Sequence, residues 1–137
     1  MIHDEIVTYE VAKLAKEKGF PQHIGNDAYV VENEYDVEYE VGSCYPIQFI
    51  PDYLPTITAP TQSLLQRWLR EEKSVNISID SEEDFGGENL IYEWQASHKK
   101  YIADGSFILN PVSDMEFYST YEKALEYALK YALENLT

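Results

Sequence analysis

Hydrophobic and polar residues alternate along several stretches of this chain and recur at helical spacing along others. The most regular alternation spans residues 29–41, where acidic side chains occupy every second position and mostly apolar residues lie between them. The five acids are Glu32, Glu34, Asp36, Glu38 and Glu40. Successive side chains of a strand point to opposite faces. The stretch therefore predicts one long strand, or two strands with a turn near residues 33–34, carrying a row of carboxylates on one face.

Further strands are predicted in the second half of the chain. Apolar residues alternate with polar ones from Val75 to Ile79, and again over residues 90–97, where Trp94 lies on the apolar face. The turn signal Asp104-Gly105 predicts a third strand at residues 106–109. Between residues 45 and 58, three prolines predict an irregular connection that contains only a short edge strand at residues 47–50.

Two helices are predicted in the first half from apolar residues at helical spacing. The first spans about residues 9–18, with Thr8 as its N-cap and Gly19 as the residue that ends it. The second begins at Pro60, a favoured first helical residue, and runs to about Glu72.

A third helix is predicted after Ser119 and Glu122, which form a capping box. One continuous apolar stripe follows: Tyr121, Ala124, Leu125, Ala128, Leu129, Ala132, Leu133 and Leu136. We expect Leu65, Trp68, Leu129 and Leu133 to be buried where the second and third helices cover the sheet.

The order of these elements, α-β-(β)-α-β-β-(β)-α, defines the expected fold class. Strands grouped between single helices are typical of an α+β fold, here an antiparallel sheet of about four to five strands with helices packed mainly on one face. A length of 137 residues predicts a single domain, residues 1–137.

The charge distribution limits the classes of partner that the chain is expected to bind. The net charge is −15, and no Lys or Arg occurs between Lys18 and Arg67. Proteins that bind nucleic acid directly neutralise phosphates with basic side chains, so we expect no direct nucleic-acid binding. A strongly acidic surface favours basic partners.

Candidate chemistry is sparse, and we expect no catalytic residues, no cofactor and no metal. His3, His23 and His98 are too scattered for a zinc motif. Cys44 and His23 could in principle form a nucleophile–base pair, but no local motif supports one. The acidic loop expected at residues 81–88 lacks the ligand spacing of an EF-hand, and we expect it to bind no metal. The chain is therefore predicted not to be an enzyme.

The acidic row is the candidate binding site: Glu32, Glu34, Asp36, Glu38 and Glu40. It can serve as a surface for a basic protein, as a mimic of a DNA backbone, or as a plain solvated face that discourages aggregation. A small enzyme with an unrecognised pocket is a further alternative. Twelve tyrosines leave open a homodimer through an aromatic surface.

Membrane and export signals are not expected. No apolar run approaches the roughly 18 residues that span a bilayer, and the first residues lack the basic and apolar regions of a signal peptide. Cys44 is the single cysteine, which excludes an internal disulfide. These features predict a cytoplasmic protein.

Three segments carry a resemblance: residues 11–20 (VAKLAKEKGF), 59–71 (APTQSLLQRWLRE) and 120–129 (TYEKALEYAL), together about a quarter of the chain. In this order they resemble a group of small proteins of unknown activity that are encoded by phages and mobile elements of gut bacteria. The resemblance implies a shared three-helix layout and an intracellular phage or mobile-element origin. It transfers no catalytic or binding residue.

Overall fold

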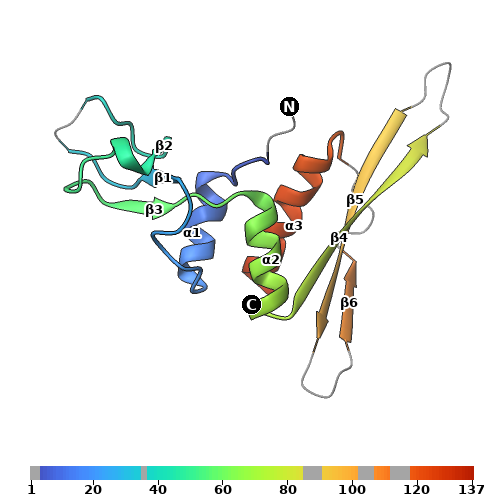
Figure 1. Ribbon diagram of the computed structural model, residues 1–137. Helices are drawn as coiled ribbons and strands as arrows, with labels where there is room; N and C mark the ends of the chain where they lie inside the picture. The colour runs from blue at the N-terminus through green and yellow to red at the C-terminus, as the bar shows by residue number, and fades with distance from the viewer. Residues whose placement is uncertain (1–3, 35–36, 85–90, 102–106, 112–117) are drawn as a thin grey trace. The chain divides into compact units, whose positions relative to one another are not determined.

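The computed structural model describes residues 4–34, 37–84, 91–101, 107–111 and 118–137 (Figure 1). The chain divides into two compact units, residues 1–64 and 65–137. The class is α+β, as predicted. The single sheet that the sequence predicted is wrong, because the strands form two separate three-stranded antiparallel sheets, β2-β1-β3 and β4-β5-β6. The assignment of all 137 residues to one domain stays a prediction.

In the first unit, helix α1 (Tyr9–Glu17) forms as predicted. The Thr8 hydroxyl accepts a hydrogen bond from the Val11 amide at 3.4 Å and so satisfies one of the free N–H groups of the first turn. Gly19 has φ +97°, the left-handed conformation that ends many helices. The Phe20 amide then donates to the Ala15 carbonyl at 2.9 Å, and the Phe20 side chain is buried.

The sheet of the first unit consists of β1 (Asp27–Val30), β2 (Cys44–Pro46) and β3 (Thr56–Thr58). The central strand β1 pairs with both neighbours and buries Ala28, Tyr29 and Val30. The Tyr29 hydroxyl donates to the Val7 carbonyl at 2.5 Å, so this buried phenol has its polar end satisfied.

The long alternating strand predicted at residues 29–41 is wrong, in both of its versions. Strand β1 ends at Val30, and β2 begins only at Cys44. Gly42, at φ +81°, donates its amide to the Val30 carbonyl at 2.8 Å, and the Val30 amide donates to Ser43. These bonds join the two ends of the connection between β1 and β2, and its described residues, 31–34 and 37–43, lie in no strand. Alternation alone could not reveal that the described part of this segment has no neighbouring strand to pair with.

The edge strand predicted at residues 47–50 is also wrong. Residues Ile47–Phe49 form the 3-10 turn η1, and the flanking residues Cys44–Pro46 and Thr56–Thr58 are the strands. Proline spacing correctly indicated an irregular connection, but the pairing partner in β1 decides which residues become extended.

The sheet of the second unit contains β4 (Val75–Asp84), β5 (Ile91–Tyr101) and β6 (Phe107–Pro111). Its register pairs Ile77 with His98, and Val75, Ile77, Ala96 and His98 are all buried. The strands predicted from residue 75 onward are therefore confirmed, although only Val75, Ile77 and Ala96 of the expected inner positions are buried, while Ile79 and Trp94 are half-buried. The loop expected at residues 81–88 is partly wrong, because β4 continues to Asp84, while residues 85–90 lie outside the described part.

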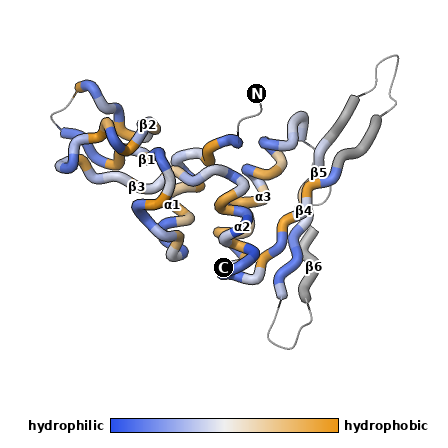
Figure 2. The backbone as a smooth tube through the Cα atoms, in the orientation of Figure 1, coloured by the Kyte–Doolittle hydropathy of each residue, from blue (hydrophilic) through white to orange (hydrophobic). Residues whose placement is uncertain are grey.

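Helix α3 (Tyr121–Asn135) contacts β4 and β5, and Figure 2 shows hydrophobic stretches on α3 and on the described parts of these strands. Its predicted stripe is buried except for Tyr121, which is exposed. The N-cap is Thr120 rather than Ser119, because the Thr120 hydroxyl accepts from the Lys123 amide at 3.1 Å. At the other end, the Lys100 ammonium donates to the Leu136 carbonyl at 2.6 Å, a favourable place for a cation.

Helix α2 (Gln62–Glu72) begins two residues later than predicted, and the border between the two units falls within it. Leu65 and Leu69 are fully buried. The expectation of a buried Trp68 is wrong, since this side chain is half-buried, and the Lys73 ammonium lies 5.4 Å from its ring centroid. In the second unit, the Gln66 side-chain amide donates to the Ile77 carbonyl of β4 at 3.0 Å.

Candidate functional site: an acidic hollow in the first unit

The acidic residues singled out by the sequence lie on the loop between β1 and β2. Glu32, Glu34, Glu38 and Glu40 are exposed, while Asp36 lies outside the described residues. Among the described residues between these acids, Val37 does not turn inward as a strand would require, since it is 97% exposed, and Tyr39 is half-buried. The four described carboxylates therefore reach solvent as expected, but on an irregular loop and without the regular spacing of a row.

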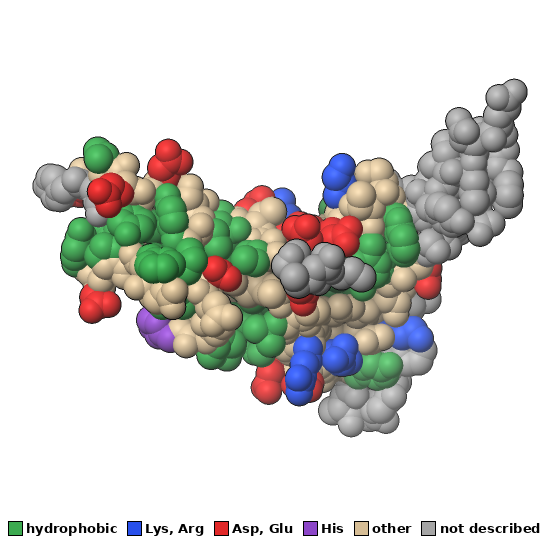
Figure 3. All heavy atoms as spheres, turned by 45° about the horizontal axis from the view of Figure 1, so that its top comes forward, with side chains coloured by type: hydrophobic (Ala, Val, Ile, Leu, Met, Phe, Trp, Pro, Cys, Tyr) green, Lys and Arg blue, Asp and Glu red, His purple; other side chains and the backbone are tan. Residues whose placement is uncertain are grey.

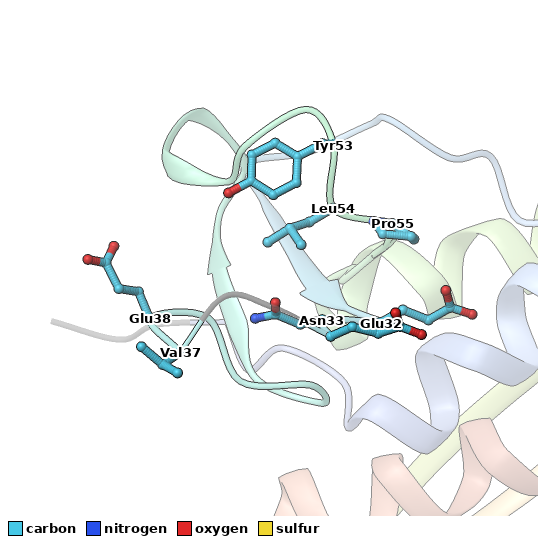
Figure 4. Close-up of a pocket in the computed structure, with 8 residues that line it drawn as sticks. Glu32, Asn33, Val37, Glu38, Tyr53, Leu54 and Pro55 are labelled. Carbon is cyan, nitrogen blue, oxygen red and sulfur yellow. The ribbon is translucent and has the colours of Figure 1, made fainter.

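Three of these carboxylates line a hollow of about 580 Å³, here called the acidic hollow. In Figure 4, Tyr53 and Leu54 lie opposite Asn33, with Glu38 on one side and Glu32 on the other. Its lining combines carboxylates with apolar side chains: Glu32, Asn33, Glu34, Val37, Glu38, Tyr53, Leu54 and Pro55. The tertiary structure thus adds residues 53–55, which the sequence reasoning missed and for which the chain offers no local motif.

The loop between β1 and β2, which carries the exposed acids, is hydrogen-bonded to the connection that follows β2. The Tyr39 hydroxyl donates to the Phe49 carbonyl at 2.6 Å, and the Asn33 side-chain amide donates to the Tyr39 carbonyl. The Tyr45 hydroxyl accepts from the Glu40 amide at 2.9 Å, while the Tyr39 and Tyr45 rings meet edge-on at 5.1 Å. These contacts connect the described residues of this loop to β2 and to the segment that follows it.

Exposed apolar side chains concentrate around this hollow. Val37 is 97% exposed, Tyr53 73% and Phe49 61%. Figure 3 shows hydrophobic side chains gathered over the sheet and loops of the first unit, with acidic ones among them. Apolar groups that gather at a surface and are rimmed by polar residues mark sites of protein interaction.

The candidate nucleophile Cys44 lies on β2 and is half-buried. Burial raises the pKa of its thiol, and the nearby Asp27 carboxylate raises the pKa further. The thiol is therefore protonated at neutral pH, which is the opposite of what a nucleophilic cysteine needs. Among the described residues, no group of His, Cys, Asp and Glu side chains could hold a metal ion.

His98 is a fully buried titratable side chain for which the sequence predicted no role. It lies on β5, is fully buried, and its Nε2 is 2.8 Å from the Ala128 carbonyl oxygen of α3. Since a carbonyl can only accept, Nε2 carries the proton. Its Nδ1 is buried and has no hydrogen-bond partner in the described structure. Extending the alternation of residues 90–97 by one step would have placed His98 on the inner face.

Several aromatic side chains of the second unit contact one another. Trp94 meets Tyr121 edge-on at 5.5 Å between ring centroids, and the His98 and Tyr131 rings lie 5.1 Å apart. These rings therefore contact one another within the second unit. A homodimer formed through aromatic residues stays a prediction.

No protein-family model matches the chain, and neither a curated protein nor a solved structure is significantly similar to it. Within the described part of the chain, the helices are too short or too polar to cross a bilayer.

Proposed function

We propose that this chain is a non-enzymatic protein whose first unit binds a basic segment of another protein in the acidic hollow. The observation that supports the proposal is the joint lining of the hollow by three carboxylate residues and by apolar side chains. The sequence adds that the stretch between Lys18 and Arg67 contains acidic residues but no Lys or Arg.

The chemistry of the lining fits long cationic side chains. Lys and Arg lay their aliphatic stems along apolar surface while the charged head stays among polar groups. Val37, Leu54 and Pro55 offer apolar surface, and Glu32, Glu34 and Glu38 offer charge. The ring of Tyr53 can add a cation–π contact. Complementary charge also steers a basic partner toward the hollow and rejects acidic ones.

The two alternatives have less support. A DNA mimic needs carboxylates at regular spacing, and the four described ones, Glu32, Glu34, Glu38 and Glu40, lie on segments that form no strand. An enzyme has less support because, among the described residues, the lining of the hollow includes no Ser, Cys, His or Lys that could form a nucleophile–base pair.

The sequence supports a proposal for the origin of the protein and the compartment in which it acts. Residues 11–20, 59–71 and 120–129 resemble segments of small proteins encoded by phages and mobile elements, and this resemblance supports an accessory role in such an element. The single cysteine and the acidic composition support action in the cytoplasm without direct contact to nucleic acid.

The first test changes the three carboxylates of the hollow at once. The variant Glu32→Gln, Glu34→Gln, Glu38→Gln should bind a fluorescein-labelled peptide of alternating Lys and Ser about tenfold more weakly, since each exposed ion pair contributes about 0.2–1 kcal/mol. Fluorescence anisotropy measures the Kd. The difference should shrink at high salt, because screening weakens exposed charge pairs.

A matched control separates the site from bulk charge. Glu17→Gln, Glu72→Gln, Asp80→Asn changes the net charge equally at exposed positions that do not line the hollow. It should retain most of the parent affinity. An equal loss in both triple variants would mean that only total charge matters, which contradicts the proposed site.

A further inference from the structure

Strand β4 forms one edge of the sheet in the second unit, since the strand order of that sheet is β4-β5-β6. The pairing of β4 with β5 continues from Val75 to Asp84, whereas β6 pairs only with residues 97–101 of β5 (Figure 1). An unpaired edge presents a row of backbone N–H and C=O groups, which can bond to a further strand.

The hydrogen bonds between β4 and β5 show which residues of β4 direct their backbone groups outward. In an antiparallel pair, residues bonded to the partner strand alternate with residues whose N–H and C=O face away from it. The Tyr101 amide donates to the Ser74 carbonyl at 2.9 Å, so every second residue after Ser74 also bonds to β5. The backbone groups of Val75, Ile77 and Ile79 therefore face the outer edge.

A side chain of helix α2 closes this edge at one position. The Gln66 side-chain amide donates to the Ile77 carbonyl at 3.0 Å, as the outward direction of that carbonyl requires. Ile79, the next outward residue, is half-buried, and among the described residues no group outside the sheet bonds to its amide or carbonyl. We call residues 79–84 of β4 the open edge, because no other described strand pairs with them on this side.

We propose that the open edge receives an extended basic segment of another protein as an added strand. Strand addition derives its affinity from main-chain hydrogen bonds, while alternate side chains of the added strand give specificity. The inference goes beyond the proposed function, because it places a second binding site in the second unit.

The charge of the open edge selects the chemistry of its partner. Four of its residues are acidic, Asp80, Glu82, Glu83 and Asp84, and none is basic. The register also places Glu82 opposite Glu93 of β5, and like charges at directly opposed positions destabilise a sheet. An added strand with Lys or Arg at alternate positions brings the opposite charge to this part of the sheet.

A second copy of the chain does not fit the same edge. Because the edge is closed at Ile77, a second β4 could pair only along residues 79–84. If the two copies of Ser81 were opposed in an antiparallel pair, Asp80 of each copy would lie opposite Glu82 of the other. Such like-charge pairs are unfavourable, and charge on an edge strand is a common protection against association of copies. The same acids favour a basic strand.

The test compares two fluorescein-labelled peptides of equal charge that alternate Lys and Thr. One has free backbone amides, and the other is N-methylated at two adjacent central residues, so that each edge of the peptide lacks a donor. The parent protein should bind the unmethylated peptide at least about tenfold more tightly, the ratio expected from losing about two backbone hydrogen bonds. Fluorescence anisotropy gives both Kd values.

Two substitutions at Ile79 locate the contact. Ile79→Pro removes the outward amide, and the sheet should remain intact because that amide does not donate to β5. This variant should lose most of the preference for the unmethylated peptide. The matched control is Ile79→Thr, which changes the side chain but retains the amide, and it should keep the preference. Circular dichroism verifies that both variants are folded.

Hydrogen exchange of the Ile79 amide tests the same contact in the parent protein. A saturating concentration of the unmethylated peptide should slow this exchange at least about tenfold, since the amide would then donate to the added strand. An unchanged exchange rate at saturation overturns the inference, whatever the result with Ile79→Pro.

The triple variant Glu32→Gln, Glu34→Gln, Glu38→Gln separates this site from the acidic hollow. The preference for the unmethylated peptide should persist in it, because these residues belong to the first unit. Loss of the preference in this variant would assign it to the acidic hollow and overturn the inference. Equal binding of the two peptides by the parent protein overturns strand addition but not the proposed function, whereas binding of neither peptide contradicts both.

Discussion

Leu129→Ala should lower the free energy of unfolding of the second unit by about 2–5 kcal/mol, the range for replacing a buried leucine with alanine, which leaves a cavity in the core. Leu129 is fully buried on α3, the helix that contacts β4 and β5. Such a loss is a large share of the stability of a small domain. Urea denaturation followed by tryptophan fluorescence measures it, because Trp68 and Trp94 both belong to residues 65–137.

The control for this measurement is Glu134→Ala on the same helix. Glu134 is exposed, and its carboxylate lies 3.9 Å from the Lys130 ammonium. An exposed pair of this kind contributes about 0.3–0.5 kcal/mol, so the free energy of unfolding of the variant should be close to that of the parent protein. A Leu129→Ala protein that unfolds with the control would show that α3 is not packed as described.

Acid should destabilise the second unit between about pH 7 and pH 5, and His98 should be the cause. Burial lowers the pKa of His98, although its hydrogen bond to Ala128 raises the pKa in part. Protonation would place a charge on Nδ1, which is buried without a partner in the described structure. Because protonation then favours the unfolded chain, the stabilising effect is complete above the unfolded pKa of about 6.5 and is lost as the pH falls below it.

The measurement is the free energy of unfolding at several pH values. Its slope cannot exceed about 1.4 kcal/mol per pH unit for one proton. His98→Gln keeps a side-chain amide that can donate to the Ala128 carbonyl and removes the titration, so its stability should be flat over this range. Carboxylates titrate mainly near pH 4 and contribute little above about pH 5. An unchanged slope in His98→Gln would assign the acid sensitivity to other groups.

Much of the local structure follows from short-range patterns. Helix α1 begins and ends at the predicted signals, Thr8 and Gly19, because capping and left-handed glycine act within one turn. The alternation from Val75 onward and the helical spacing in α3 identify most of the described residues that become buried, with Ile79, Trp94 and Tyr121 as exceptions. In these segments the local period and the core face agree.

The candidate site was only half predictable. The sequence indicated exposed acids at Glu32, Glu34 and Glu38, because unpaired carboxylates are costly to bury. It did not indicate Tyr53, Leu54 and Pro55, which join those acids in one hollow. Hydrogen bonds such as that from Tyr39 to the Phe49 carbonyl link residues ten positions apart, and no periodicity encodes them.

By itself, the sequence determined three helices, an α+β class, the buried positions Val75, Ile77 and Ala96 in the second unit, and an acidic stretch without Lys or Arg between residues 18 and 67. Only the tertiary structure decided that the strands form two sheets and that β1 ends at Val30, well before β2 begins at Cys44. The physical reason is that a strand exists only where a neighbour supplies hydrogen bonds. Alternating side chains show which face a strand would have, but not whether a partner strand is there.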